Sequence, residues 1–263
     1  MICLLFASCS VQTNLAYDFV WKTKGAEVAF YIPKELTKIN IRKDCQGKFL
    51  DSIAPEDIND TINARTIIVN KIDEEKFFNV MISSFESTLN DYNLKLSYWE
   101  NENTKPDSLH WVVDLSHIEV IEFMEYIMAD CGYDSYEFIP STSVNVDSWF
   151  DLINSDNPTG TLLYTEQSFV EYVEDCNYYY DTLNNVVVSA DIQRLTIDGF
   201  YDFAVMLGKL YAGYSYDYFM NDYVKKEMMR RGKEYSEDKY MRYDPYESYI
   251  YRTRRDKLIR VEE

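Results

Sequence analysis

The sequence predicts an α+β fold, a two-layer sandwich in which a mostly antiparallel sheet packs against two helices, one of them long and C-terminal. Alternating apolar residues recur in short segments across much of the chain, which indicates strands. Two other segments place apolar residues at helical spacing. Glycine and proline number only 8 and 6 among 263 residues, which favours long regular elements joined by short turns.

The first predicted strand is Glu27–Ile32, where apolar residues alternate until Pro33 ends the pattern. The polar stretch 37–60 is interpreted as a connection, with a weak strand signal at Ile39–Ile41. The β-rich run Ala64–Asn70 then predicts a buried strand. These segments supply the first part of the predicted sheet.

A helix is predicted from Glu74 to Tyr92. Asp73 occupies the N-cap position, and two glutamates in the first turn meet the positive end of the helix dipole. One face of this helix carries an apolar stripe, formed by Phe78, Met81, Phe85 and Leu89. The alternating segment Leu94–Trp99 follows as a strand, which completes a strand, helix, strand unit.

A long antiparallel hairpin is predicted next. Its first strand, Leu109–Tyr126, changes phase at Ser116 and His117, which indicates a β-bulge. Glutamates at three-residue spacing leave a helix at Ile118–Met128 as an alternative. The segment Tyr136–Ile153 returns along the first strand and makes the hairpin longer than average.

The last elements are two strands and a helix. One strand covers Thr161–Thr165, with an extension to Val173 as an option, and another covers Val186–Ala190. The second helix begins after Gly199 and ends at Gly232. At roughly 30 residues it extends about 45 Å, so we expect it to overhang a small domain.

Residues 10–232 are expected to form a single domain, followed by a tyrosine- and charge-rich tail at 233–263. The formal charge is −19, which argues against nucleic acid as a partner because phosphates are repelled. From Lys225 onward the chain carries 12 basic and 9 acidic residues, so the charge is asymmetric. The tail can either fold back on the acidic body or act as a docking arm.

No catalytic motif is present. The chain lacks a nucleophile elbow, a phosphate-binding loop and a dinucleotide fingerprint. The carboxylate pairs Glu122 and Glu125, and Asp147 and Asp151, are of the kind used in glycoside hydrolysis. Such pairs are expected by chance among 45 acidic residues, so we predict no enzyme and no cofactor.

Metal and redox sites are not predicted either. His110 and His117 have no metal-ligand spacing around them, and no two cysteines are separated by two residues. The body contains Cys45, Cys131 and Cys176. One disulfide with a free thiol and three buried thiols are both compatible with the sequence.

The N-terminus, residues 1–9, is an apolar run that ends in small residues before Cys9. Through Phe6, Ala7, Ser8 and Cys9 it resembles a lipoprotein signal of Bacteroidetes-like bacteria. Phe6 stands where leucine is usual, and no basic segment precedes the run, as in a signal truncated at its start. The resemblance implies a lipidated Cys9 and an outer-membrane anchor, on the periplasmic face because no acidic residues follow. The alternative is a core strand at Ile2–Ala7.

The predicted order of elements after a lipidated cysteine is similar to the αβ sandwich of small outer-membrane assembly lipoproteins. The similarity covers about Ala64–Arg231 and rests on topology and Cys9. It implies a non-enzymatic role in envelope assembly or transport. In that role, apolar residues of the long hairpin and of the helix from Phe200 dock on an envelope protein or an amphipathic ligand.

Glycan binding is a second predicted function. The chain has 24 tyrosines, whose rings can stack on sugars while their hydroxyls form hydrogen bonds. The candidate binding residues are Tyr178, Tyr179, Tyr180, Tyr214 and Tyr218.

Overall fold

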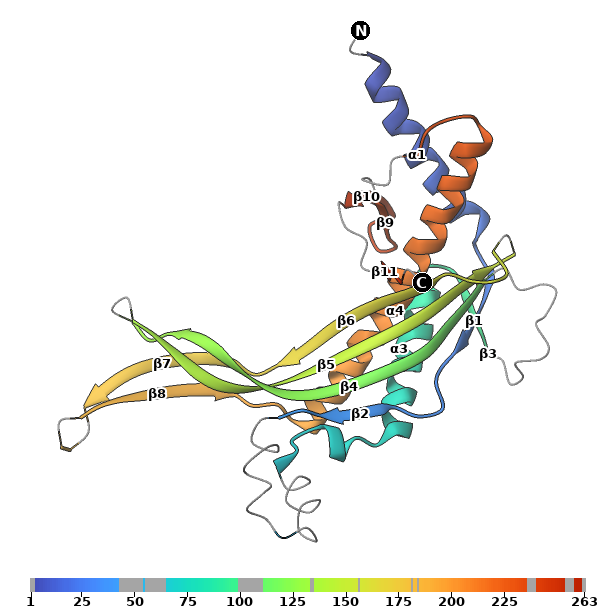
Figure 1. Ribbon diagram of the computed structural model, residues 1–263. Helices are drawn as coiled ribbons and strands as arrows, with labels where there is room; N and C mark the ends of the chain where they lie inside the picture. The colour runs from blue at the N-terminus through green and yellow to red at the C-terminus, as the bar shows by residue number, and fades with distance from the viewer. Residues whose placement is uncertain are drawn as a thin grey trace.

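The computed structural model describes residues 3–42, 54, 65–98, 111–132, 135–155, 157–180, 182–183, 185–235, 240–253 and 258–261, with side chains from residue 11 onward. The fold is α+β, as predicted. Among the described residues, the helices pack on one face of a twisted sheet, and a long extension projects from the sheet (Figure 1). Among the described helices, none is both long enough and apolar enough to span a bilayer.

The main sheet has the strand order β11-β6-β5-β4-β1-β3, with β2 beside β4. Strands β4, β5, β6 and β11 are antiparallel, whereas β1 runs parallel to β3 and β4, and β2 runs parallel to β4. Their bounds are β1 Glu27–Tyr31, β2 Thr37–Asn40, β3 Lys95–Tyr98, β4 Trp111–Asp130, β5 Tyr136–Asn154, β6 Leu162–Val170 and β11 Ile259–Arg260.

The predicted long hairpin is confirmed. Strands β4 and β5 pair along their whole length, and the register shifts between Leu115 and His117, where the sequence predicts a bulge. The alternative helix at Ile118–Met128 is wrong. Ile118 and Val120 are both buried on the helix-covered face of the sheet, which is the two-residue period of a strand.

Helices α3 (Glu74–Asp91) and α4 (Ile197–Arg230) form the second layer. The Asp73 carboxylate accepts a hydrogen bond from the Lys76 N–H, and the predicted apolar stripe of α3 is buried. The two helices cross closely at Gly208, where an added Cβ would lie 2.2 Å from a backbone carbonyl oxygen of α3. Helix α4 has 34 residues and continues beyond the sheet (Figure 1).

A third helix, α1, covers Cys3–Lys22, so the alternative strand at Ile2–Ala7 is wrong. Its buried residues pack on the half of α4 that continues beyond the sheet. The Phe19 ring lies 5.5 Å from the Tyr216 ring and 5.6 Å from the Tyr223 ring. The sequence analysis missed this helix, although its buried residues Leu15, Ala16, Phe19 and Val20 recur at helical spacing.

The predicted strand at Ala64–Asn70 is wrong. Part of this run forms a 3-10 turn at Val69–Lys71, although Ile68 and Val69 are fully buried. The N–H groups of Ile67, Ile68 and Val69 donate to the Glu122 carboxylate at 2.9, 2.9 and 3.0 Å. A side chain therefore satisfies the donors that a neighbouring strand would otherwise satisfy.

Glu122 of β4 is completely buried and has a charged partner. Arg42 Nη1 lies 3.4 Å from Glu122 Oε1 and also donates to Thr142 Oγ1 at 2.9 Å. Arg42 is held there by β2, which pairs with β4 up to Asn40 and realises the weak strand signal at Ile39–Ile41. A buried carboxylate is tolerated when donors surround it on several sides, as they do here.

The chain after α4 packs back on the body where it is described. Strands β9 (Tyr240–Asp244) and β10 (Tyr249–Thr253) form a hairpin. The Asn221 side chain of α4 donates to the Met241 carbonyl and accepts from its N–H, and so fixes β9 to the helix. Strand β11 adds to the edge of β6.

The Glu122→Gln substitution tests this arrangement. The neutral amide cannot compensate Arg42, and its NH2 group cannot accept from the N–H groups of residues 67–69. We expect a loss of about 3 kcal/mol in the free energy of unfolding, measured by urea denaturation. The matched variant Glu119→Gln, on the same strand at a partly exposed site, should lose less than about 0.5 kcal/mol. Equal losses in both variants would contradict the proposed role of Glu122.

Candidate functional site

The extension from the sheet, which we call the arm, consists of two hairpin ribbons. One is the distal part of β4 and β5, residues 123–141, beyond the last pairs that β2 and β6 make with them. The other is the hairpin of β7 (Tyr172–Tyr180) and β8 (Val186–Gln193), which forms a separate sheet. Both ribbons project from the body in the same direction (Figure 1).

A second, small core joins the two ribbons. Its buried members are Ala129, Cys131, Ile139 and Cys176, with partly buried residues of β7 and β8 around them. Cys131 and Cys176 form a disulfide bond. Of the two arrangements that the sequence left open, the one with a disulfide is therefore present, and Cys45 lies outside the described residues. The arm thus has its own covalent and apolar connection.

Glu171 fixes the base of the arm. This buried carboxylate lies between β6 and β7, so β6 ends at Val170 and does not extend to Val173. It accepts from the Thr142 N–H of β5 at 2.8 Å and pairs with Arg194, just after β8, at 2.9 Å. Both ends of the β7–β8 hairpin are therefore tied to β5. Thr142 also contacts Arg42, so this group is continuous with the one around Glu122.

Large apolar side chains cover the outer side of the β4–β5 ribbon. This aromatic face consists of Tyr126, Met128, Tyr136 and Phe138, which are 63, 60, 55 and 68% exposed. Met128 and Phe138 are directly opposite each other across the ribbon. The intervening residues Ala129 and Ile139 point to the other ribbon and are buried. A contiguous exposed apolar patch of this kind typically marks a binding surface.

The arm is strongly acidic. Residues 123–140 and 171–193 contain nine Asp or Glu residues and no Lys or Arg. The sequence of the arm therefore gives it a net negative charge beside the apolar aromatic face. Anionic surfaces would be repelled from it.

The predicted binding tyrosines do not form one site. Tyr178, Tyr179 and Tyr180 lie on β7 in the arm, and Tyr179 and Tyr180 are exposed. Tyr178 is half-buried and its hydroxyl donates to Glu137 of β5. Tyr214 and Tyr218 lie on α4 in the body, Tyr214 buried and Tyr218 half-buried. The predicted lipidation residue, Cys9, lies in the part of α1 where the backbone alone is described.

Helix α4 does not offer the docking surface that was expected from Phe200 onward. Phe200, Phe203 and Leu207 are all buried in the main core. Their apolar faces cover the sheet and α3. Within the described structure, the exposed large apolar side chains of α4 are Met206 and Met229, which lie far apart on the helix, whereas four such side chains gather on the distal hairpin.

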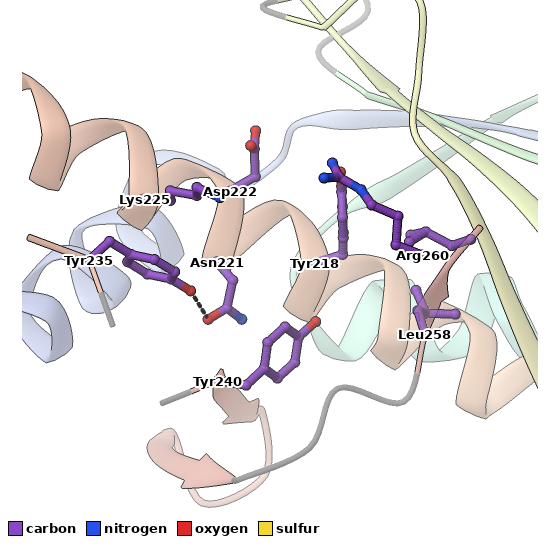
Figure 2. Close-up of a pocket in the computed structure, with 9 residues that line it drawn as sticks. Tyr218, Asn221, Asp222, Lys225, Tyr235, Tyr240, Leu258 and Arg260 are labelled. Carbon is purple, nitrogen blue, oxygen red and sulfur yellow. Dashed lines mark hydrogen bonds between the residues drawn. The ribbon is translucent and has the colours of Figure 1, made fainter. Parts of the chain in front are cut away.

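A cavity of about 330 Å3 lies beside the C-terminal half of α4 (Figure 2). Its walls combine aromatic, apolar and charged side chains from α4, β6, β9, β11 and the segments next to them. The lining residues are Leu163, Tyr218, Asn221, Asp222, Lys225, Tyr235, Tyr240, Leu258 and Arg260. Of the predicted site residues, Tyr218 contributes to this cavity.

The carboxylate pairs noted in the sequence are separated or occupied. Glu122 and Glu125 lie on opposite faces of β4, and Glu125 accepts a hydrogen bond from Ser143.

The sequence analysis missed a different group of acidic residues, which lies on the face of the sheet away from the helices. Register places Glu119, Asp147 and Glu166 directly opposite one another on three adjacent strands. Strand pairing alone brings them together, so no local sequence signal could identify them.

Electrostatics in this row raise the pKa of Asp147 above its ordinary value. Partial burial is the main cause, the Tyr164 hydroxyl opposes it, and the charges of Glu166 and Glu119 add to it. Beside this row, His117 Nε2 lies 3.0 Å from Glu119 Oε1, and its ring contacts Trp149. His110 lies outside the described residues. Within the described part, no three His, Cys, Asp or Glu side chains are grouped to hold a metal ion.

Comparison with known proteins gives little guidance. No family model and no curated protein matches the chain. One similar solved structure is a neuraminyllactose-binding hemagglutinin homolog from Helicobacter pylori, with 11% sequence identity and a TM-score of 0.32. The match covers 79% of this chain and 91% of that chain. At this TM-score the likeness carries no argument about fold or function.

The Asp147→Asn substitution tests the acidic row. A carboxyl group whose pKa is raised by folding binds its proton more tightly in the folded state, so it costs stability once it ionises. Asp147→Asn should therefore raise the urea midpoint at pH 7, and the gain should disappear as the pH falls through the pKa of the folded Asp147. In Asp202→Asn, a control at an exposed position on α4, the midpoint should not rise. A lower midpoint for Asp147→Asn at pH 7 would contradict the assignment.

Proposed function

We propose that this chain is a non-catalytic, lipid-anchored protein of the bacterial cell envelope that binds a protein partner through the aromatic face of its arm. The observation that carries the proposal is the exposure of Tyr126, Met128, Tyr136 and Phe138 on a ribbon fixed at its base and cross-linked to its neighbour. The role is assistance in envelope assembly or transport through contacts.

The structure of the arm supports contact with a protein. Exposed aromatic and methionine side chains on a preformed surface are typical of the centres of protein interfaces. Because Glu171 and the Cys131–Cys176 disulfide hold the ribbons, little conformational entropy is lost on binding. The negative charge of the arm gives the partner's chemistry, since a surface that combines apolar side chains with lysines or arginines would be complementary.

The proposed anchor is Cys9. Lipidation there would leave a mature helix that begins at Cys9 and keeps Leu15 and Phe19 packed in the core. The N-terminal part of α1 extends beyond the body, whereas the arm projects elsewhere (Figure 1). Residues 222–231, at the end of α4, contain four basic residues, Lys225, Lys226, Arg230 and Arg231, and two acidic ones, Asp222 and Glu227, which pair with the last three. The net positive charge of this end, on the helix that packs against α1, would favour anionic headgroups. The proposed location is the periplasmic face of the outer membrane.

Glycan binding by the arm is the second candidate function. The observation that favours it is the exposure of Tyr179 and Tyr180 on β7, at 51 and 73%. Their rings are available to stack on neutral sugars. The negative charge of the arm would disfavour acidic glycans.

Photo-cross-linking from the arm tests the proposal. A benzophenone amino acid at Phe138, in cells that produce the full chain, should give a discrete protein adduct. The same group at Tyr249, an equally exposed aromatic position on β10, should not. Tyr126→Ser combined with Met128→Ser should weaken the Phe138 adduct about tenfold, since interface aromatic and methionine anchors dominate binding.

The anchor is tested in the same cells. A fatty-acid analogue should label the protein, and Cys9→Ala should abolish the label and reduce the Phe138 adduct because the tether is lost. Equal adducts from Phe138 and Tyr249, or none from either, would contradict docking through the arm. Sugar binding by the purified protein that is lost in Tyr179→Ser and Tyr180→Ser would instead support the second function.

A further inference from the structure

The cavity beside α4 is built from one face of that helix. Tyr218, Asn221, Asp222 and Lys225 are spaced three, four and seven residues from the first, so they share one side of the helix. Arg260 of β11 and Leu258, just before that strand, form the opposite wall. Figure 2 shows Arg260 approaching from β11, with Lys225 and Asp222 on the helix across from it.

Two of the polar lining residues are occupied by the protein itself. Asn221 Nδ2 donates to the carbonyls of Asp217 and Met241, both at 2.7 Å, and its Oδ1 accepts from the Met241 N–H at 2.9 Å. Asp222 pairs with Lys226 at 2.7 Å and accepts from Asn154 at 3.0 Å. Neither side chain is therefore available as the main recognition group for a ligand.

The other charged side chains that line the cavity within the described residues are Lys225 and Arg260. Lys225 lies 6.0 Å from the centre of the Tyr235 ring. Arg260 is exposed and has no ion pair with any carboxylate of the described residues. The negative charge of Asp222 is compensated by Lys226, so Arg260 is the group in the described lining that can pair with an anion. A guanidinium group of this kind binds carboxylates with two parallel hydrogen bonds.

The other walls are rings and apolar side chains. Tyr218, Tyr235 and Tyr240 provide flat faces, and Leu163 and Leu258 complete the apolar surface. Burial raises the pKa of Tyr218, so its hydroxyl stays protonated and can donate. Small-molecule sites span about 300–1,000 Å3, so a cavity of this size has room for a single ring.

We infer that this cavity is a binding site for a small organic acid, a carboxylate carried on a six-membered ring. Arg260 holds the carboxylate. The tyrosine rings and the two leucines contact the ring of the ligand. Two kinds of compound have this chemistry, acidic monosaccharides and aromatic acids. The site is separate from the arm and does not depend on its function.

Calorimetric titration of the purified full chain tests the inference with three probes. They are D-glucuronate, benzoate and, as the uncharged counterpart of the first, D-glucose. We expect heat of binding from glucuronate or benzoate at concentrations up to about 10 mM, and binding of glucose at least about tenfold weaker. Binding of glucuronate alone identifies the sugar class, and binding of benzoate alone identifies the aromatic class.

The variant Arg260→Gln should weaken binding of the acid about tenfold or more, because the charge-assisted hydrogen bonds are lost. Arg260 is exposed on a two-residue edge strand, so the fold should tolerate this change. Arg230→Gln removes the same charge at an exposed position outside the cavity and should change the affinity less than about twofold. The inference is overturned if neither acid binds or if glucose binds as tightly as glucuronate. It is also overturned if Arg260→Gln and Arg230→Gln change the affinity for the acid by the same factor.

Discussion

Two buried carboxylates determine how the parts of this molecule are joined. Glu122 accepts three consecutive backbone N–H groups and pairs with Arg42, and Glu171 accepts from β5 while pairing with Arg194. Glu122 joins the loop at residues 65–69 to the main sheet, and Glu171 joins the β7–β8 hairpin to it. Neither segment pairs with the sheet as a strand at these positions. Burying a carboxylate is costly unless its oxygens have hydrogen-bond and charged partners. The positions of these partners therefore restrict the chain to one arrangement.

Thr142 connects the two carboxylate groups. Its hydroxyl accepts from Arg42 and its N–H donates to Glu171, so the sheet, the loop at residues 65–69 and the base of the arm share one polar network. Beyond this point the arm has its own small core and its disulfide. The physical consequence is an extended surface that keeps its shape without support from the main core. Such preorganisation lowers the entropy lost when a partner binds.

Local patterns in the sequence predicted an element correctly where the pattern of buried residues is set within that segment alone. Helix α3, the β4–β5 hairpin and the bulge near His117 come from periodicity within each segment. Ala64–Asn70 has the composition of a strand, but its N–H groups are satisfied by Glu122, which lies 54 residues after Ile68. The stripe of helix α1, Leu15, Ala16, Phe19 and Val20, has helical spacing, so this helix could have been predicted from the sequence. The aromatic face could not be assigned. Both sides of the distal ribbon are apolar, and the β7–β8 hairpin covers one of them.

The account rests on the arm being a fixed extension of the body, and a distance measurement between the two tests this most directly. Spin labels on unnatural amino acids at Ser87 of α3 and Tyr179 of β7, both exposed, leave every cysteine unchanged. Pulsed electron paramagnetic resonance should give one narrow distance distribution, which should broaden in Glu171→Gln. A broad distribution in the unaltered protein would show that the arm moves freely, and would contradict the account.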